Sequence, residues 1–141
     1  MTQAPSDTDL RDILTTTQVI GMVGASLNPA RPSYGVAGYL AGQGYRVIGV
    51  NPGLAGQMLF GTPIVASIAD LPAEVDMLDV FRRSEAVPEA VEEAIKALPN
   101  LRTIWLQLGV ISDAAEQMAA RAGIIFVQDR CPKIDHARLI R

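Results

Sequence analysis

The residues best placed to hold a ligand form a glycine loop, Gly24, Ala25 and Ser26, which follows a short apolar run beginning at Val19. A glycine directly after a strand lets the backbone approach a pyrophosphate, whose charge is met by backbone N–H groups and by the N-terminus of the next helix. Ser26 adds a hydroxyl donor. An ordinary strand-to-loop turn explains the same residues, since one glycine is a weak signal. The loop alone leaves both interpretations open.

Three arginines lie near this loop or at the end of another apolar run. Arg31 belongs to a polar insertion, residues 27–34, which prolines stiffen and which also carries Ser33. A guanidinium matches the geometry of phosphate, although a solvated surface arginine is the alternative. Arg82 and Arg83 follow the apolar run 76–81. We expect at least one of these two to face the ligand, and the other to be solvated.

The loop does not match the NAD-binding fingerprint. That fingerprint is G-x-G-x-x-G, whereas residues 21–26 read G-M-V-G-A-S. It also requires an acidic residue at the end of the second strand to hold the ribose, and Asn51 and Pro52 occupy that place. A small NAD(P)-dependent oxidoreductase is therefore the second hypothesis.

The elements that must position these residues alternate between strand and helix. Apolar runs predict strands over residues 19–25, 46–50, 76–81, 103–108 and 124–128. Helical spacing predicts four helices. The first begins near the caps Ser6 and Asp7, and the second ends at 42–44. The third covers 87–98, and the fourth begins at a capping box of Asp113 and Glu116. Residues 54–72 are expected to be irregular, and those after 128 to form a tail.

This pattern predicts a single α/β domain over residues 1–141, with a Rossmann-like, doubly wound, mainly parallel five-stranded sheet and helices on both faces. Ligands bind such sheets at the carboxyl ends of the strands, near the point where the strand order reverses. The clusters at 24–26, 51–52, 81–83, 107–109 and 129–131 should therefore meet at one edge.

Composition limits the class of protein. The 141 residues are 49% hydrophobic and 19% charged, which is typical of a soluble globular domain. A net charge of -3 argues against broad nucleic-acid binding. The longest apolar runs are strand-length, so no membrane helix is expected. Cys131 is the only cysteine, and the N-terminus has no signal-peptide layout, so we expect a reducing, cytoplasmic setting.

Five segments in consistent order resemble the stand-alone CoA-binding domain proteins, which are similar to the N-terminal domain of the succinyl-CoA synthetase α-subunit. They are V-G-A-S-x-N-P-x-R-P-S (23–33), G-Y-R-V-I-G-V-N-P (44–52), V-D-M-L-D-V-F-R-R (75–83), W-L-Q-L-G-V (105–110) and D-R-C-P-K (129–133). Each is modest alone, but five in register are specific, and the match runs from about Thr17 to His136.

The resemblance implies coenzyme A as the ligand, with a residue set that follows the strand ends. Its phosphates would lie over Gly24, Ala25 and Ser26, with Arg31 and Ser33 nearby. Asn51 and Pro52 would border the nucleotide, and Phe81 and Arg82 would flank it. Gln107 to Gly109 would line the pantetheine path. We further expect Gly24→Val to abolish binding and leave the fold intact, because the side chain would occupy the phosphate's place.

No catalytic constellation is evident in the sequence. His136 is the only histidine and has no orienting partner in sequence, so a structural or solvated role is favoured. Cys131 is expected to pack the last strand, although Arg130 and Lys133 beside it leave a reactive thiolate open. These two residues cannot make a closed zinc site, which needs four ligands.

The sequence therefore predicts a protein without enzymatic activity that binds CoA or an acyl-CoA, and a sensor or carrier role is a hypothesis. The alternatives are the NAD(P)-dependent oxidoreductase and a ligand-free Rossmann module that acts through contacts with a protein partner.

Overall fold

Five parallel strands form the central sheet of the computed structural model, which describes residues 4–140. The sheet order is β2-β1-β5-β6-β7, and every neighbouring pair is parallel. The bounds are β1 (Val19–Val23), β2 (Arg46–Val50), β5 (Met77–Val80), β6 (Thr103–Leu106) and β7 (Ile125–Val127). This confirms the predicted α/β sheet, and most strands end a residue or two earlier than the apolar runs do. Gly24, for example, has a φ of +85°, which takes the chain out of the β1 ladder.

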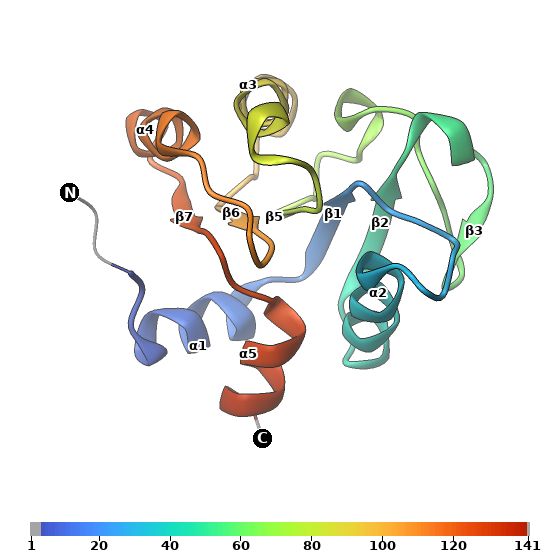
Figure 1. The fold of residues 1–141 in the computed structure, drawn as a ribbon, viewed down its shortest axis with the longest axis horizontal. Coiled ribbons are helices and arrows are strands. Elements are labelled where there is room, and N and C mark those ends of the chain that lie inside the picture. The colour runs from blue at the N-terminus through green and yellow to red at the C-terminus, as the bar shows by residue number, and fades with distance from the viewer. Residues whose placement is uncertain (1–3, 141) are drawn as a thin grey trace.

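Helices cover both faces of the sheet, as predicted. Figure 1 shows α3 (Val87–Ala97) and α4 (Asp113–Arg121) on one face, and α1 (Asp7–Thr16), α2 (Pro32–Gly42) and α5 (Pro132–Leu139) on the other. Successive strand residues enter opposite cores. In β5, Leu78 and Val80 pack with the α3 side, whereas Met77 packs with the α1 and α2 side. The strands are apolar in a continuous run because both of their faces are covered.

The strand order reverses between β1 and β5. From β1 the chain crosses through α2 to β2, and from β2 it returns to β5 on the other side of β1. The loops after β1 and β5 therefore leave the sheet in opposite directions, which opens a crevice between them at the carboxyl edge. The glycine loop at Gly24 lies at this point.

Residues 52–72 contain more structure than the sequence predicts. The chain forms the 3₁₀ turns η1 (Pro52–Leu54) and η2 (Ile68–Asp70), and between them an antiparallel hairpin of β3 (Met58–Leu59) and β4 (Thr62–Pro63). A further 3₁₀ turn, η3 (Ser84–Ala86), precedes α3. Two-residue strands are too short to show an alternating pattern. The hairpin is held by packing, since the ring of Phe60 lies 4.8 Å from that of Tyr34 and against Gly38.

The prediction of a C-terminal tail is wrong, because residues 132–139 form α5. A buried ion pair fixes this helix. The Asp135 carboxylate, 3% exposed, accepts hydrogen bonds from Arg130 at 2.8 and 2.9 Å and from Arg138 at 3.1 Å. Burial acts to raise the pKa of Asp135, but these arginines outweigh it and hold the pKa below its usual value.

Helix caps were predicted correctly at α1 and one residue late at α4. Ser6 accepts a hydrogen bond from the Asp9 N–H and caps α1. At α4, Ser112 is the cap instead of Asp113, because the Ser112 hydroxyl accepts from the Ala115 N–H at 3.1 Å. The predicted capping box of Asp113 and Glu116 is therefore wrong.

Gly24 is required by the packing of β1 against the end of β5. A Cβ at this position would collide with the carbonyl oxygen of Phe81 and lie 3.0 Å from its carbonyl carbon. The expectation that Gly24→Val leaves the fold intact is therefore wrong, since its Cβ would point into β5 and not into the ligand's place.

We expect Gly24→Ala to lower the free energy of unfolding by about 2 kcal/mol or more, because a positive φ and a backbone collision add together. Gly61→Ala is the matched control, since Gly61 has the same φ of +85° and nothing within 4 Å of its added Cβ. It should cost about 1 kcal/mol. Urea unfolding measures both, and equal losses would contradict a collision at Phe81.

Asp79 places a carboxyl group inside the sheet without a partner. Its side chain is 0% exposed, and neither oxygen has a hydrogen-bond partner in the described part of the chain. Its neighbours across the sheet are Met22 and Trp105. Burial raises the pKa of Asp79 well above its ordinary value, because the charged form loses its hydration there. The folded chain therefore keeps this group as the neutral acid at pH values where the unfolded chain has ionised it.

The Asp79 carboxyl should make stability fall as the pH rises above about 4, where the unfolded chain releases this proton. The contribution is complete below that pH and is lost as the pH rises toward the raised pKa of the folded state. In Asp79→Asn this loss is absent, so urea unfolding from pH 4 to 8 should give a flatter profile than in the wild type. Asp12→Asn, an exposed change on α1, should retain the wild-type profile. A wild-type pH profile in Asp79→Asn would contradict burial of the neutral acid.

Candidate ligand-binding site

A cleft of about 630 Å³ lies at the carboxyl edge of the sheet, between the glycine loop, the start of α2 and the ends of β5 and β6. Most of the predicted ligand residues line it: Gly24, Ala25, Ser26, Arg31, Ser33, Asn51, Phe81, Arg82 and Gln107. They come from four of the five strand-end clusters and from the insertion before α2. The topology therefore brings together residues that are far apart in the sequence.

The glycine loop is tied to the end of β2. The N–H groups of Gly24 and Ala25 donate to the carbonyl oxygen of Val50 at 3.2 and 3.3 Å. The Asn51 amide donates to the Ala25 carbonyl at 2.8 Å, and its own oxygen accepts from the Gly53 N–H at 2.9 Å. The N–H groups of Gly24 and Ala25 therefore already have an acceptor within the protein, which corrects the expectation that they donate to a phosphate.

Two other backbone donors remain available at the cleft. The N–H groups of Ser26 and Ser33 have no acceptor among residues 4–140. Ser33 is the second residue of α2, where the helix dipole favours an anion. The Ser26 hydroxyl accepts from the Asn28 N–H at 3.0 Å and so shapes the loop. The loop presents donors from Ser26 onward, and Gly24 permits the close approach of the loop to Phe81.

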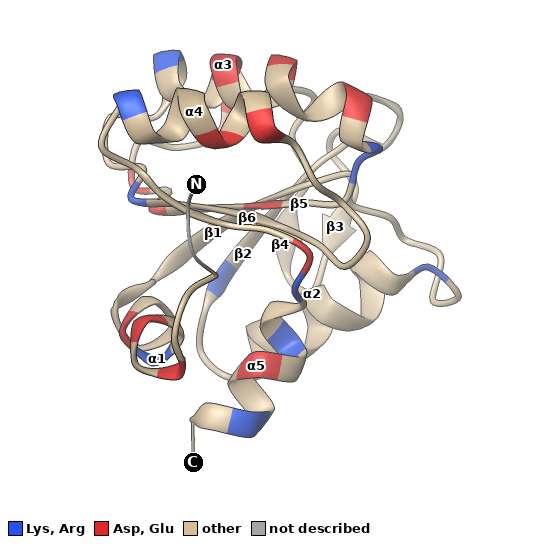
Figure 2. Cartoon of the chain, turned by 60° about the vertical axis from the view of Figure 1, so that its left-hand side comes forward, with Lys and Arg blue, Asp and Glu red and all other residues tan. Residues whose placement is uncertain are grey.

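The cleft is locally basic in an acidic chain. Arg31, Arg82 and Arg83 all line it, and none of the three makes an ion pair within the described residues. Both Arg82 and Arg83 line the cleft, which agrees with the expectation that at least one of them faces it, and both are exposed. In Figure 2 most of the acidic residues lie along α1, α3 and α4. The site can therefore attract an anion through a local cluster.

Gln107 is a buried polar residue in the lining of the cleft. The residue is 8% exposed, and its side-chain oxygen has no hydrogen-bond partner in the described structure. A buried polar atom without a partner costs free energy, and such atoms are rare in native proteins. An N–H or O–H group of a ligand would satisfy it.

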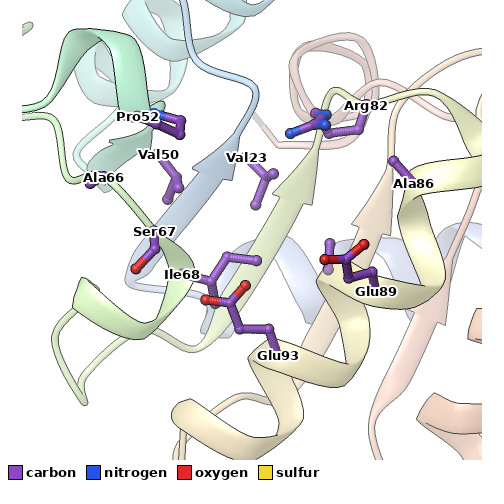
Figure 3. A pocket seen from close by; sticks show the side chains of 11 residues that line it. Val23, Val50, Pro52, Ala66, Ser67, Ile68, Arg82, Ala86, Glu89 and Glu93 are labelled. Carbon is purple, nitrogen blue, oxygen red and sulfur yellow. The ribbon is translucent and has the colours of Figure 1, made fainter.

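A second cavity of about 230 Å³ lies on the α3 side of the same edge. Figure 3 shows Arg82 above the ends of β1 and β5, with Glu89 and Glu93 reaching in from α3. Arg82 lines both cavities, so they meet at the reversal of strand order. Pro52 lines this second cavity, whereas Asn51 before it lines the main cleft.

The fifth strand-end cluster does not line the cleft. Asp129 accepts a hydrogen bond from the Gly109 N–H at 2.7 Å, Arg130 turns to Asp135, and Cys131 is buried. Gly109 is itself absent from the cleft lining, although its neighbours Leu108 and Val110 are present. The predicted range Gln107 to Gly109 includes Leu108 but not Val110, and the place of Val110 in the same loop was the available signal.

Neither His136 nor Cys131 lies at the cleft. His136 is buried on α5, where its Nδ1 lies 3.0 Å from the Tyr39 hydroxyl, and burial lowers its pKa. Cys131 belongs to the core beneath α2. Both therefore occupy the structural positions that the sequence favours for them. Residues 4–140 contain no group of three acidic, histidine or cysteine side chains that could hold a metal, and no helix there is long and apolar enough to cross a membrane.

Known proteins resemble this chain over nearly its whole length. The family model described as "CoA binding domain" matches residues 18–137. The uncharacterized protein YneT of Bacillus subtilis is 33% identical over 135 residues, which cover 96% of this chain and 97% of YneT. A solved structure from Thermus thermophilus has 40% identity and a TM-score of 0.90, covering 96% of this chain and all of that one. A hypothetical protein from Pyrococcus horikoshii has 34% identity and the same TM-score, over 100% of this chain and 99% of that one. With the Rossmann-like sheet and the strand-end cleft, these matches show that the chain belongs to the CoA binding domain family.

Proposed function

We propose that this protein binds coenzyme A or an acyl-CoA in the main cleft and holds it without catalysing a reaction, as a carrier or sensor. The observation that carries the proposal is the unpartnered Gln107 oxygen in the same cleft as three arginines that make no ion pair within residues 4–140. Family membership supports CoA as the ligand.

The donor set fits the two chemical halves of CoA. Its phosphates require cations and N–H donors, which Arg31, Arg82 and Arg83 and the N–H groups of Ser26 and Ser33 offer. Its pantetheine arm carries amide N–H groups, for which the Gln107 oxygen is an acceptor. A simple phosphate ion would use the first set and leave Gln107 unsatisfied.

The absence of catalysis is supported by the kind of side chains in the cleft. Its ionisable lining residues are arginines, and a guanidinium remains protonated in proteins, so it does not serve as a general base. Glu89 and Glu93 lie in the second cavity, where Glu93 accepts a hydrogen bond from the Ala69 N–H. His136 and Cys131 lie on the side of the sheet that α1, α2 and α5 cover, and neither lines the cleft.

The NAD(P) alternative is disfavoured by the role of Asn51. Both polar atoms of its side chain are already used, one on the Ala25 carbonyl and one on the Gly53 N–H. No carboxylate stands where a dinucleotide site needs one for the ribose.

Calorimetric titration with CoA, acetyl-CoA, NAD and NADP tests this function. We expect CoA and acetyl-CoA to bind and the two dinucleotides to give no heat. Native mass spectrometry of protein purified without added ligand should show a mass increase equal to CoA or an acyl-CoA. Binding of NAD without binding of CoA would favour the oxidoreductase. If none of the four compounds binds, the ligand-free module that acts through a protein partner would be favoured. Release of free thiol from acetyl-CoA by the protein would contradict the non-catalytic role.

Gln107→Leu should separate binding from stability. Because the change removes an unpaired buried oxygen, we expect the free energy of unfolding to rise by about 1 kcal/mol. Loss of one hydrogen bond to the ligand should weaken CoA binding about fivefold to tenfold. Gln117→Leu makes the same change on the exposed face of α4 and should affect neither property. Unchanged CoA affinity in Gln107→Leu would remove Gln107 from the site.

A further inference from the structure

The loop after β6 presents apolar side chains at the mouth of the main cleft. Leu108 is 54% exposed and Ile111 is 51% exposed, and Val110 between them is partly buried. Leu108 and Val110 line the cleft, directly after Gln107. Large exposed apolar side chains grouped at a cleft commonly mark a binding surface.

Hydrogen bonds hold the backbone of this loop in place. The Gly109 N–H donates to Asp129 at 2.7 Å, the Val110 N–H to the Gln107 carbonyl at 2.9 Å, and the Ile111 N–H to the Ser84 hydroxyl at 3.1 Å. The last of these bonds joins the loop to the segment that follows Arg82 and Arg83. The exposed side chains therefore stand on a fixed backbone, beside the basic part of the cleft.

The cleft thus has two ends of different polarity. Arg31, Arg82 and Arg83 make one part cationic and Gln107 offers a neutral acceptor. Leu108 makes the rim apolar, and the exposed Ile111 follows it in the same loop. A ligand complementary to all three parts has a polyanionic head, an amide-bearing arm and an apolar tail. Free CoA ends in a thiol and would leave the rim uncovered, and a carboxylated acyl group would place a charge against it.

We propose that the ligand is an acyl-CoA with an uncharged aliphatic acyl chain, which lies against Leu108 and Ile111. This inference rests on the proposed function, since it needs CoA in the main cleft.

Titration calorimetry of the full chain with CoA, acetyl-CoA, hexanoyl-CoA and succinyl-CoA tests it. Full burial of a methylene strengthens binding about fourfold, and burial on an open rim should give about half of that factor. Hexanoyl-CoA has four more methylenes than acetyl-CoA, so we expect it to bind roughly fifteenfold more tightly. Succinyl-CoA should bind no more tightly than acetyl-CoA.

The double variant Leu108→Ser, Ile111→Ser should reduce the hexanoyl-to-acetyl affinity ratio to less than about twofold. Using the ratio within each variant cancels any general effect on CoA binding, and a measurable CoA affinity shows that the variant is folded. Ile134→Ser is the matched control, because Ile134 is also 54% exposed but lies on α5. It should retain the wild-type ratio.

The outcomes separate this inference from the proposed function. If the wild type binds no CoA compound, the proposed function fails and the inference fails with it. If it binds CoA but gains nothing from the hexanoyl chain, or if the gain survives in the double variant, only the acyl assignment is overturned. Equal affinity for succinyl-CoA and hexanoyl-CoA overturns it as well.

Discussion

The close approach of the glycine loop to the end of β5 is the constraint on which the rest of the site depends. Gly24 lies so near the Phe81 carbonyl that no Cβ fits between them, and the Phe81 N–H donates to the Val23 carbonyl at 2.8 Å. On its other side the loop is bonded to Val50 and Asn51 at the end of β2. Because three strand ends hold it, Ser26 and the start of α2 occupy fixed positions at the cleft.

The reversal of strand order explains how an acidic chain presents a basic site. Both faces of the sheet are covered, so charged residues lie mainly on the outer sides of helices and in loops (Figure 2). Arg31 leaves the sheet with the loop after β1, whereas Arg82 and Arg83 leave it after β5. The reversal of strand order brings these two loops to opposite sides of one cleft. An anion of limited size meets this local cluster, and an extended polyanion would meet the acidic helices as well.

Periodicity predicted the parts of the fold that depend on local pattern. Buried strands and amphipathic helices show in the sequence, and a parallel sheet must gather its carboxyl ends, so Gly24, Phe81 and Gln107 were expected together. Pairing that depends on distant residues was not predictable. α5 is joined to α1 by the ion pair between Arg138 and Asp7, and the Gly24 and Ala25 N–H groups are used because Val50 lies beside them.

The sequence also does not show where a single residue sets the direction that the backbone takes after a strand. Pro52 follows Asn51 directly, yet it turns into η1 and lines the cavity on the other face of the sheet. Asp129, with a φ of +57°, turns back to hold Gly109, and this removes the fifth strand end from the cleft. Turns of this kind depend on single backbone angles and local hydrogen bonds, which a hydrophobic pattern does not encode.

Asn51 connects the choice of ligand to the folding of the loop. A dinucleotide site needs a carboxylate at this strand end, but here the side chain must donate to the Ala25 carbonyl while it accepts from the Gly53 N–H. An ionised aspartate accepts only, so it could replace the second contact and not the first. The loop would then lose one of its ties to the end of β2, and a carboxylate would face a carbonyl oxygen. The residue that removes the NAD signature is therefore one that this form of the glycine loop requires.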